Sequence, residues 1–279
     1  MTYNICLRGE GWGAEAALRS LQNNFDNISI WSPDADIQKM ARARDLLIDA
    51  YCHEYDLVVC AGHKGIISQA DLDSHEHLNV HYSLLPKYRG LHSVVWAILN
   101  NEPETGVTFH KMNAFIDDGD IVTQYKTPCN QQTALEVMNA CHKIVETALG
   151  EDVRALLDGE ISPTPQDKDA ASWVTKRVRE DCKIDFNQGV VYINNLIRAL
   201  VAPYPLPYFS IKGHDCTLTR GCAIARPYIS TNGKVVNIDS DGVWVKISDG
   251  LLLIQEVETD GVRIKANTLD LKIGNALND

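Results

Sequence analysis

The chain has 279 residues, of which 45% are hydrophobic and 23% are charged. This length and composition indicate one large globular domain or two of ordinary size, and they exclude a disordered chain. The formal net charge of −11 argues against electrostatic binding of nucleic acid over a large surface, although it is compatible with a local basic patch.

The compartment is predicted from what the chain lacks. No apolar run approaches the roughly 20 residues that a membrane span needs, and the first residues run into a strand-like segment without the basic start and apolar core of a secretion signal. The eight cysteines are scattered and form no Cys-x-x-Cys pair. They are therefore interpreted as reduced thiols rather than as disulfides or a zinc site, and we expect a cytoplasmic protein without membrane contact.

The first half of the chain alternates strand-like and helix-like segments. Apolar patterns predict strands over 3–8, 28–31, 56–60, 78–81, 106–112 and 121–125, and helices over 12–22, 36–51, 93–99 and 132–157. Alternation of this kind predicts an α/β fold with a mostly parallel, Rossmann-like sheet that carries helices on both faces.

The second half has a different character. Residues 162–167 form a turn-rich segment, a helix with an apolar face follows, and residues 203–207 contain three prolines. Short β-like runs separated by glycine turns then indicate a small antiparallel, OB-like barrel or sandwich. We therefore expect a catalytic domain over 1–160, a linker with a helix over 161–205, and a C-terminal β domain over 206–279.

The strongest functional signal is an amide and an imidazole on one strand. Asn79 and His81 stand two positions apart, so their side chains project from the same face of an extended backbone. The segment 83–86, which ends in a proline, terminates this strand. Asp117 lies further along the chain, in an acidic turn that contains a glycine. An amide donor beside a titratable base, with a carboxylate to orient that base, is an apparatus suited to acyl transfer.

These motifs resemble the 10-formyltetrahydrofolate-dependent formyltransferases. The resemblance is carried by Asn79-x-His81-x-Ser83-Leu84-Leu85-Pro86, by Asp117 placed 36 residues after His81, by 105–108 before the acidic turn, and by 195–199 before the β domain. It covers most of the chain. It implies an enzyme that moves a formyl group from 10-formyltetrahydrofolate to an amine, with Asn79, His81 and Asp117 as catalytic residues.

Those residue types suit that chemistry. Attack of an amine on a formyl carbon places negative charge on an oxygen, to which the Asn79 amide and protonated His81 are suitable donors; one well-placed donor of this kind contributes about 3 kcal/mol. His81 can also relay the proton, because an imidazole titrates near working pH. Asp117 is expected to favour the imidazolium and to fix the ring. Neither a metal nor a covalent intermediate is expected.

Other motifs have simpler interpretations. Ser83 lacks the surroundings of a nucleophilic serine and is expected in a turn, as are Asp118 and Asp120. The run 75–77 alternates histidine and glutamate but is expected to be exposed rather than metal-binding. The glycines at 9, 11 and 13 lack the full dinucleotide-binding spacing and are interpreted as a tight turn.

The resemblance also implies folate contacts, through backbone groups and flat apolar walls. The residues expected to make them are Gly65, Ile66, Ile67, Leu91, Asn113, Ala114, Phe115 and Ile116.

The acceptor has to be chosen between the two kinds that the family offers, methionyl-tRNA and nucleotide-linked amino sugars. Only 25 residues separate Trp31 from Leu57, which leaves no room for the long basic insertion of the methionyl-tRNA enzymes. Residues 209–279 hold eight Lys/Arg against nine Asp/Glu, a net of −1 where a tRNA-binding domain should be basic. Arg177-x-x-Glu180-Asp181 also resembles the sugar-modifying branch.

The sequence therefore predicts a nucleotide-linked amino sugar as the acceptor, in the biosynthesis of cell-surface polysaccharide such as lipopolysaccharide O-antigen. Methionyl-tRNA formylation is the alternative, and hydrolysis of the formyl donor is a third. The sequence does not decide whether the β domain binds the acceptor, forms a homodimer or only covers the sheet.

Overall fold

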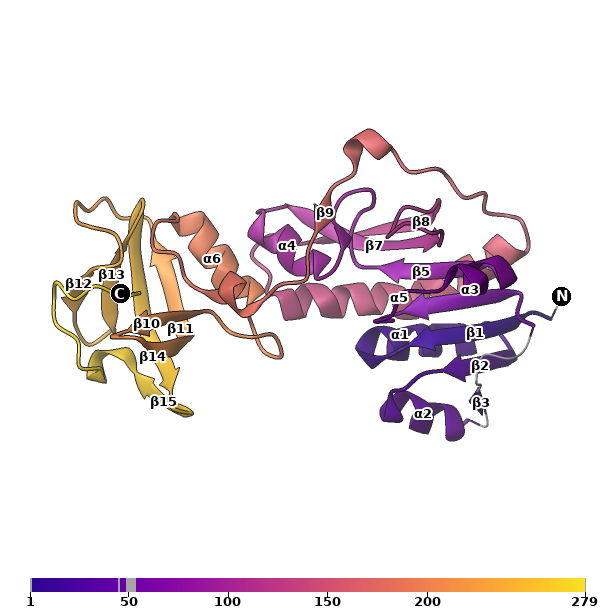
Figure 1. Ribbon diagram of the computed structural model, residues 1–279, viewed down its shortest axis with the longest axis horizontal. Helices are drawn as coiled ribbons and strands as arrows, with labels where there is room; N and C mark the ends of the chain where they lie inside the picture. Colours follow the sequence, from indigo (N-terminus) through magenta and orange to yellow (C-terminus); the bar gives the residue numbers. More distant parts are fainter. Residues whose placement is uncertain (1, 45, 49–53, 279) are drawn as a thin grey trace. The chain divides into compact units, whose positions relative to one another are not determined.

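The computed structural model describes residues 2–44, 46–48 and 54–278, and these form two compact units (Figure 1). The first unit comprises 1–94, 104–128 and 136–175, and the second comprises 95–103, 129–135 and 176–279. The domain boundaries expected from the sequence, at 160 and 205, stay a prediction.

The first unit is built on a seven-stranded sheet in the order β3-β2-β1-β4-β5-β7-β8. The first five of these strands are parallel, while β7 pairs antiparallel with both β5 and β8. The bounds are β1 (Asn4–Gly9), β2 (Asn27–Trp31), β3 (Leu47–Ile48), β4 (Leu57–Ala61), β5 (His77–His81), β7 (Glu104–Lys111) and β8 (Ile121–Pro128). The predicted mostly parallel, Rossmann-like fold is confirmed.

Helices cover both faces of this sheet. They are α1 (Gly11–Gln22), α2 (Ala35–Arg42), α3 (Gln69–Ser74) and α5 (Ala134–Leu157). A further helix, α4 (Ser93–Leu99), begins in the first unit and lies mostly in the second. Right-handed crossovers that leave β1 and β4 in opposite directions place α1 and α3 on opposite faces. A cluster of Cys6, Val58, Cys60 and Ile67 packs with Leu72 on the α3 side. No helix in the described ranges is long and apolar enough to cross a membrane.

The helix predicted over 36–51 is wrong in its second half. Asp34 caps the start of α2, since its side chain accepts hydrogen bonds from the backbone N–H groups of Asp36 and Ile37. The helix ends at Arg42, and the backbone at 47–48 instead pairs with β2, so strand pairing replaces helix propagation there. The last part of that prediction, 49–51, lies outside the described residues.

The second unit contains an antiparallel sheet in the order β10-β11-β14-β13-β12, with β15 also paired to β14. Its elements are α6 (Val190–Ala199), β10 (Tyr208–Ile211), β11 (His214–Ile224), β12 (Val235–Ile238), β13 (Val243–Ile247), β14 (Gly250–Thr259) and β15 (Val262–Lys265). The predicted C-terminal antiparallel β fold is confirmed.

The motif at 195–199 has a structural function within this second unit. Arg198 on α6 donates hydrogen bonds to the carbonyl oxygens of Cys129 (2.7 Å) and Gln132 (2.8 Å) and to the side chain of Asn195 (3.0 Å). Asn195, itself buried, donates in turn to Asn101 at 3.3 Å. A charged donor on carbonyl oxygens makes a strong hydrogen bond, so Arg198 holds the segment 129–132 onto α6, and Asn195 holds the segment around Asn101.

Candidate active site

The site lies at the carboxyl end of β5, where ligands bind in open α/β sheets. Asn79 and His81 project from the same face of this strand, as expected from their spacing. Asn79 lies opposite Cys60 on β4 and opposite His110 on β7. His81 is only 7% exposed, and Asn79 is half-buried.

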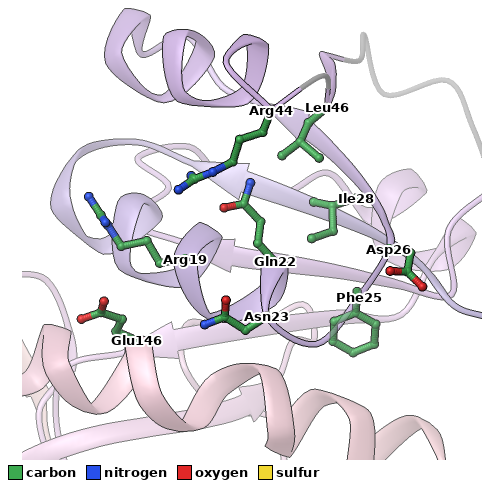
Figure 2. Close-up of a pocket in the computed structure, with 9 residues that line it drawn as sticks. All are labelled: Arg19, Gln22, Asn23, Phe25, Asp26, Ile28, Arg44, Leu46 and Glu146. Carbon is green, nitrogen blue, oxygen red and sulfur yellow. The ribbon is translucent and has the colours of Figure 1, made fainter.

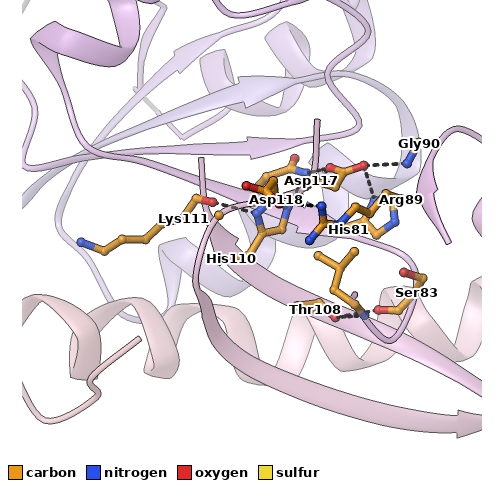
Figure 3. A network of polar contacts seen from close by, with 12 residues as sticks. His81, Ser83, Arg89, Gly90, Thr108, His110, Lys111, Asp117 and Asp118 are labelled. Carbon is orange, nitrogen blue, oxygen red and sulfur yellow. Dashed lines mark hydrogen bonds and ion pairs between the residues drawn. The ribbon is translucent and has the colours of Figure 1, made fainter. Parts of the chain in front are cut away.

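Asp117 lies against both of these side chains. Figure 3 shows it beside His81 and Gly90. Asn79 Nδ2 is 3.3 Å from Asp117 Oδ1, and His81 Nδ1 is 3.5 Å from Asp117 Oδ2. The backbone N–H of Gly90 donates to Oδ2 at 2.8 Å. The structure thus brings the three predicted catalytic residues together although Asp117 is far from the other two in sequence.

The backbone of Asp117 has a positive φ of 51°, in the left-handed region that aspartate tolerates better than most residues. Gln166 stabilises this turn, because its Nε2 donates to the carbonyl oxygens of Asp117 and Gly119, each at 2.8 Å. The orientation of the carboxylate is therefore fixed from the backbone side as well as through its oxygens.

Asp117 is held in its ionised form. Burial raises the pKa of this carboxyl, but the hydrogen bonds that it accepts, including the one from the Gly90 N–H, outweigh that effect and bring the pKa down to about 2. A buried carboxylate is costly unless its oxygens are paired, and both oxygens of Asp117 have partners.

His81 rests as the neutral ring. Burial lowers the pKa of His81, while the nearby charge of Asp117 acts in the opposite direction. Its Nε2 lies 2.9 Å from the carbonyl oxygen of Tyr88, which can only accept, so Nε2 carries the proton. Nδ1 then presents a lone pair toward Asp117. Burial therefore disfavours the protonated form of His81 before the reaction begins.

His110 joins this group and was missed from the sequence. Its Nδ1 lies 2.8 Å from the carbonyl oxygen of Lys111 and must donate to it, so its Nε2 accepts from Asn79 Nδ2 at 3.1 Å. The alternation of Val107 and Phe109 with polar neighbours does place His110 on one face of β7. The sequence does not show the register of β5 against β7, and it is this register that sets His110 opposite Asn79.

The amide of Asn79 is engaged by these neighbours. One hydrogen of its NH₂ group is directed at His110 and the other at Asp117. Donation to a developing negative oxygen, as expected from the sequence, thus requires this amide to exchange one partner. The 3.3 Å contact with Asp117 is the longer of the two and is the one more readily exchanged.

A buried arginine, Arg89, contacts two residues next to the catalytic group. Arg89, 3% exposed, donates through Nε (3.2 Å) and Nη2 (2.7 Å) to Gln166 Oε1, and its Nη1 lies 2.6 Å from Asp118 Oδ1. Asp118 was expected to act only in a turn. Its ion pair with Arg89 has little exposure on either side chain, so removal of one partner would leave a buried charge unpaired.

A two-stranded parallel sheet, β6 (Arg89–Gly90) with β9 (Trp173–Val174), fixes the loop that contacts His81 and Asp117. The N–H of Tyr88 donates to Ser172 Oγ at 2.9 Å, and the N–H of Arg89 donates to the Ser172 carbonyl oxygen at 2.8 Å. Gly90 has a φ of 102°, and a Cβ on it would lie 2.2 Å from the Val174 carbonyl oxygen, so only glycine fits.

The residues expected to contact folate lie in loops at this end of the sheet. Four apolar side chains among them are exposed, Ile66 (95%), Phe115 (73%), Ile116 (67%) and Leu91 (55%). Ile67 differs, because its side chain is buried in the cluster beneath α3. Gly65, Asn113 and Ala114 are exposed, and Asn113 Oδ1 accepts from the N–H of Phe115 at 2.9 Å. Within the described residues, no group of three or more His, Cys, Asp or Glu side chains could hold a metal ion.

A hollow of about 510 Å³ lies elsewhere in the first unit (Figure 2). It is lined by Arg19, Gln22, Asn23, Phe25, Asp26, Ile28, Arg44, Leu46 and Glu146. These residues surround the end of α1 and the start of β2, which is the amino end of the parallel strands. Because His81 lies at the carboxyl end, this hollow is not part of the candidate active site.

Two family models match the chain. The formyl transferase model covers residues 27–152, and the model of the formyl transferase C-terminal domain covers residues 177–269. The two matches lie in the same order along the chain as the two predicted domains.

Three curated relatives carry the same name. The chain is 30% identical to a methionyl-tRNA formyltransferase of Synechococcus sp. (strain JA-3-3Ab) over 90% of its own length and 78% of the relative. It is 28% identical to that of Alkaliphilus oremlandii over 80% and 72%. It is 30% identical to that of Geobacillus thermodenitrificans over 74% of its own length, so it spans about two thirds (66%) of that relative.

Solved structures show the same fold at lower identity. WlaRD, a sugar 3N-formyl transferase solved with dTDP and 5-N-formyl-THF, has a TM-score of 0.73 at 22% identity and covers 94% of this chain and 99% of its own. HypX from Aquifex aeolicus, solved with tetrahydrofolic acid, has a TM-score of 0.67 at 18% identity and covers 96% of this chain and 47% of its own.

The predicted nucleotide-sugar acceptor is wrong, because the curated relatives are methionyl-tRNA formyltransferases and the sugar enzymes are similar only at the level of fold. A net charge of −1 summed over 209–279 does not report where the charges lie, so it does not decide the acceptor. Of the eight Lys/Arg over 209–279, all except Lys246 are exposed. The predicted enzyme class is confirmed, since both family models match and relatives reach 30% identity over most of the chain: it belongs to the formyl transferase family.

Proposed function

We propose that this enzyme transfers a formyl group from 10-formyltetrahydrofolate to the amino group of methionyl-tRNA. The observation that carries the proposal is the 30% identity to a methionyl-tRNA formyltransferase over 90% of this chain. The match of 177–269 to the C-terminal domain of the family supports it, because the similarity then includes both parts of the relatives.

The apolar side chains near the site suit a folate donor. Ile66, Leu91, Phe115 and Ile116 are exposed in loops around the carboxyl end of the sheet, next to a buried polar network. A pterin is flat and apolar on its faces, with hydrogen-bonding groups on its edge, and needs such surroundings. We therefore assign these four side chains, together with the backbone at 65–67 and 113–116, to the donor, which supplies the formyl group when bound.

His81 is proposed to accept the proton of the attacking amine and to return it to the folate nitrogen as the bond between that nitrogen and the formyl carbon breaks. Its neutral ring carries a proton on Nε2, held by the Tyr88 carbonyl, and leaves Nδ1 unprotonated. A proton taken up at Nδ1 would face the carboxylate of Asp117 at 3.5 Å, which stabilises the imidazolium. Burial thus favours the base at rest, and Asp117 favours the acid once the proton has moved. A positioned acid–base group of this kind contributes about 10²- to 10⁴-fold to rate.

Asn79 is proposed to donate to the oxygen on which negative charge develops. The acceptor nitrogen of His110 and the carboxylate of Asp117 keep the NH₂ end of the amide directed into the site. His110 is therefore a positioning residue in this scheme. To donate to the developing oxygen, the amide exchanges its contact with Asp117, which at 3.3 Å is the longer of the two.

The test is a formylation assay with the purified full chain. With 10-formyltetrahydrofolate present, methionyl-tRNA should be formylated, whereas deacylated tRNA and free methionine should not be. His81→Ala should abolish most of this turnover. Turnover with a nucleotide-linked amino sugar and none with methionyl-tRNA would contradict the proposal.

A further inference from the structure

Trp173 is an exposed aromatic residue beside the active site that the mechanism above does not use. It is the first residue of β9 and is 64% exposed. An indole in water loses the stabilisation that burial would give, so a ring this open on a well-formed strand is a candidate contact for a ligand.

Its position is fixed relative to the catalytic groups. Trp173 lies directly opposite Arg89 in the β6–β9 pair, about one strand spacing of 4.8 Å away along the hydrogen-bonding direction. The residues on either side of Arg89 hold the catalytic side chains, since Tyr88 accepts from His81 and Gly90 donates to Asp117. Trp173 is therefore one backbone pairing away from the groups that we propose for proton transfer.

The orientation of the ring is also determined. The guanidinium of Arg89 lies over the indole, 5.5 Å from its centroid, and Gln166 and Asp118 hold that guanidinium in place. Arg89 is buried while the indole is 64% exposed, so Arg89 supports one side of the ring and the other side remains open. A flat apolar surface backed by a fixed cation is a good platform for an aromatic ring.

We propose that Trp173 stacks on the unpaired terminal base of the acceptor tRNA; this inference rests on the proposed function. The reacting amine belongs to an amino acid esterified to the last nucleotide, so only one aminoacyl group and one ribose separate it from that base. Single-stranded ends are recognised mainly by stacking of bases on aromatic side chains. Trp173 would therefore hold the base while the amine reaches His81.

A pterin is the competing occupant, because it is also a flat ring. We assign the donor instead to Ile66, Leu91, Phe115 and Ile116, which lie on other loops. The two assignments differ in kinetics: loss of a stacking partner for the base changes KM for methionyl-tRNA, whereas loss of one for the pterin changes KM for the donor.

The test compares Trp173→Ala and Trp173→Phe with the wild type. We expect Trp173→Ala to raise KM for methionyl-tRNA about 10-fold, the equivalent of about 1.4 kcal/mol. KM for 10-formyltetrahydrofolate should not change. Trp173→Phe should recover most of the loss, because a phenyl ring still stacks. Methionine methyl ester, which has no base, should be formylated equally by the wild type and by Trp173→Ala.

A thermal unfolding midpoint equal to that of the wild type shows that Trp173→Ala is folded. If Trp173→Ala does not fold, the KM values of Trp173→Phe still test the proposal. A KM for methionyl-tRNA that is unaltered in the variants, or a raised KM for the donor, would overturn the role of Trp173 and leave the proposed function standing. A wild-type enzyme that fails to formylate methionyl-tRNA would overturn both.

Discussion

Two regions at the carboxyl end of the same sheet contrast in exposure and chemistry. The polar network consists of Asn79, His81, His110 and Asp117, and the apolar rim consists of Ile66, Leu91, Phe115, Ile116 and Trp173. His81 is 7% exposed and the Asp117 side chain 12%, whereas Ile66 is 95% and Phe115 73% exposed. The groups proposed for chemistry are buried and hydrogen-bonded to one another, while the groups proposed for binding are open to solvent.

This difference indicates that the two regions have different energetic functions. A buried network can keep its donors and charges oriented before any substrate arrives, and such preorganisation lowers the barrier to the chemical step. An exposed apolar surface gains free energy only when a substrate covers it. Changes in the polar network should therefore lower kcat, and changes in the apolar rim should mainly raise KM.

His81→Ala should have the largest effect. It removes the proposed proton acceptor, so kcat should fall about 10²- to 10⁴-fold with little change in KM for either substrate. Steady-state assays with methionyl-tRNA and 10-formyltetrahydrofolate measure both constants. His214→Ala, which alters an exposed histidine on β11, is the control and should behave as the wild type. A kcat for His81→Ala within a few-fold of the wild type would remove His81 from the mechanism.

Asp117→Asn should follow. Asparagine keeps the shape of the side chain but removes the charge that stabilises an imidazolium at His81, 3.5 Å away. Loss of one such electrostatic contribution lowers kcat by about 100-fold. Asp120→Asn, in the same turn, is the matched control and should keep most activity. If Asp117→Asn instead raised KM for the donor with kcat intact, Asp117 would belong to the binding surface.

The sequence identified the part of this network that is local. Asn79 and His81 share a face because they are two residues apart on a strand, and that follows from backbone geometry alone. The acidic turn was a candidate on chemical grounds, and the resemblance to a family singled out Asp117 within it. His110 was missed because its position opposite Asn79 depends on the register of two antiparallel strands. That register is a three-dimensional property with no signature in either strand.

Gln166 and Trp173 were harder still to find. Gln166 follows Asp117 by 49 residues and contacts its backbone, yet it stands in a turn-rich segment without periodic pattern. Trp173 belongs to a two-residue strand, which is too short to leave a hydrophobic period. The core strands were predicted well for the opposite reason, since each is a longer apolar run whose burial is expected wherever it lies.

Phe115→Ala tests the apolar rim. The side chain is 73% exposed, so its removal should not unfold the protein, but it should weaken the binding of the pterin. We expect KM for 10-formyltetrahydrofolate to rise about 10-fold, since that corresponds to about 1.4 kcal/mol, the scale of one buried apolar contact. Ile273→Ala, which changes an apolar residue of 67% exposure in the second unit, is the control. A loss of kcat without a change in donor KM would break the distinction between network and rim.

The acidic limb of the pH profile should show how burial and charge compete at His81. Burial lowers the pKa of this ring below its usual 6.5. Because the neutral ring is the active base, the part of the acidic limb that belongs to His81 should lie below pH 6.5, at that lowered pKa. The amine of the substrate must also be unprotonated to attack, and it contributes a separate limb at higher pH. Asp117 opposes the effect of burial, so Asp117→Asn should lower the pKa of His81 further and move the limb to more acidic pH. Asp117 itself, with a pKa of about 2, titrates too low to produce this limb. The absence of any limb below pH 6.5 in the wild type, or a limb there that moves to higher pH in Asp117→Asn, would show that another group controls proton transfer.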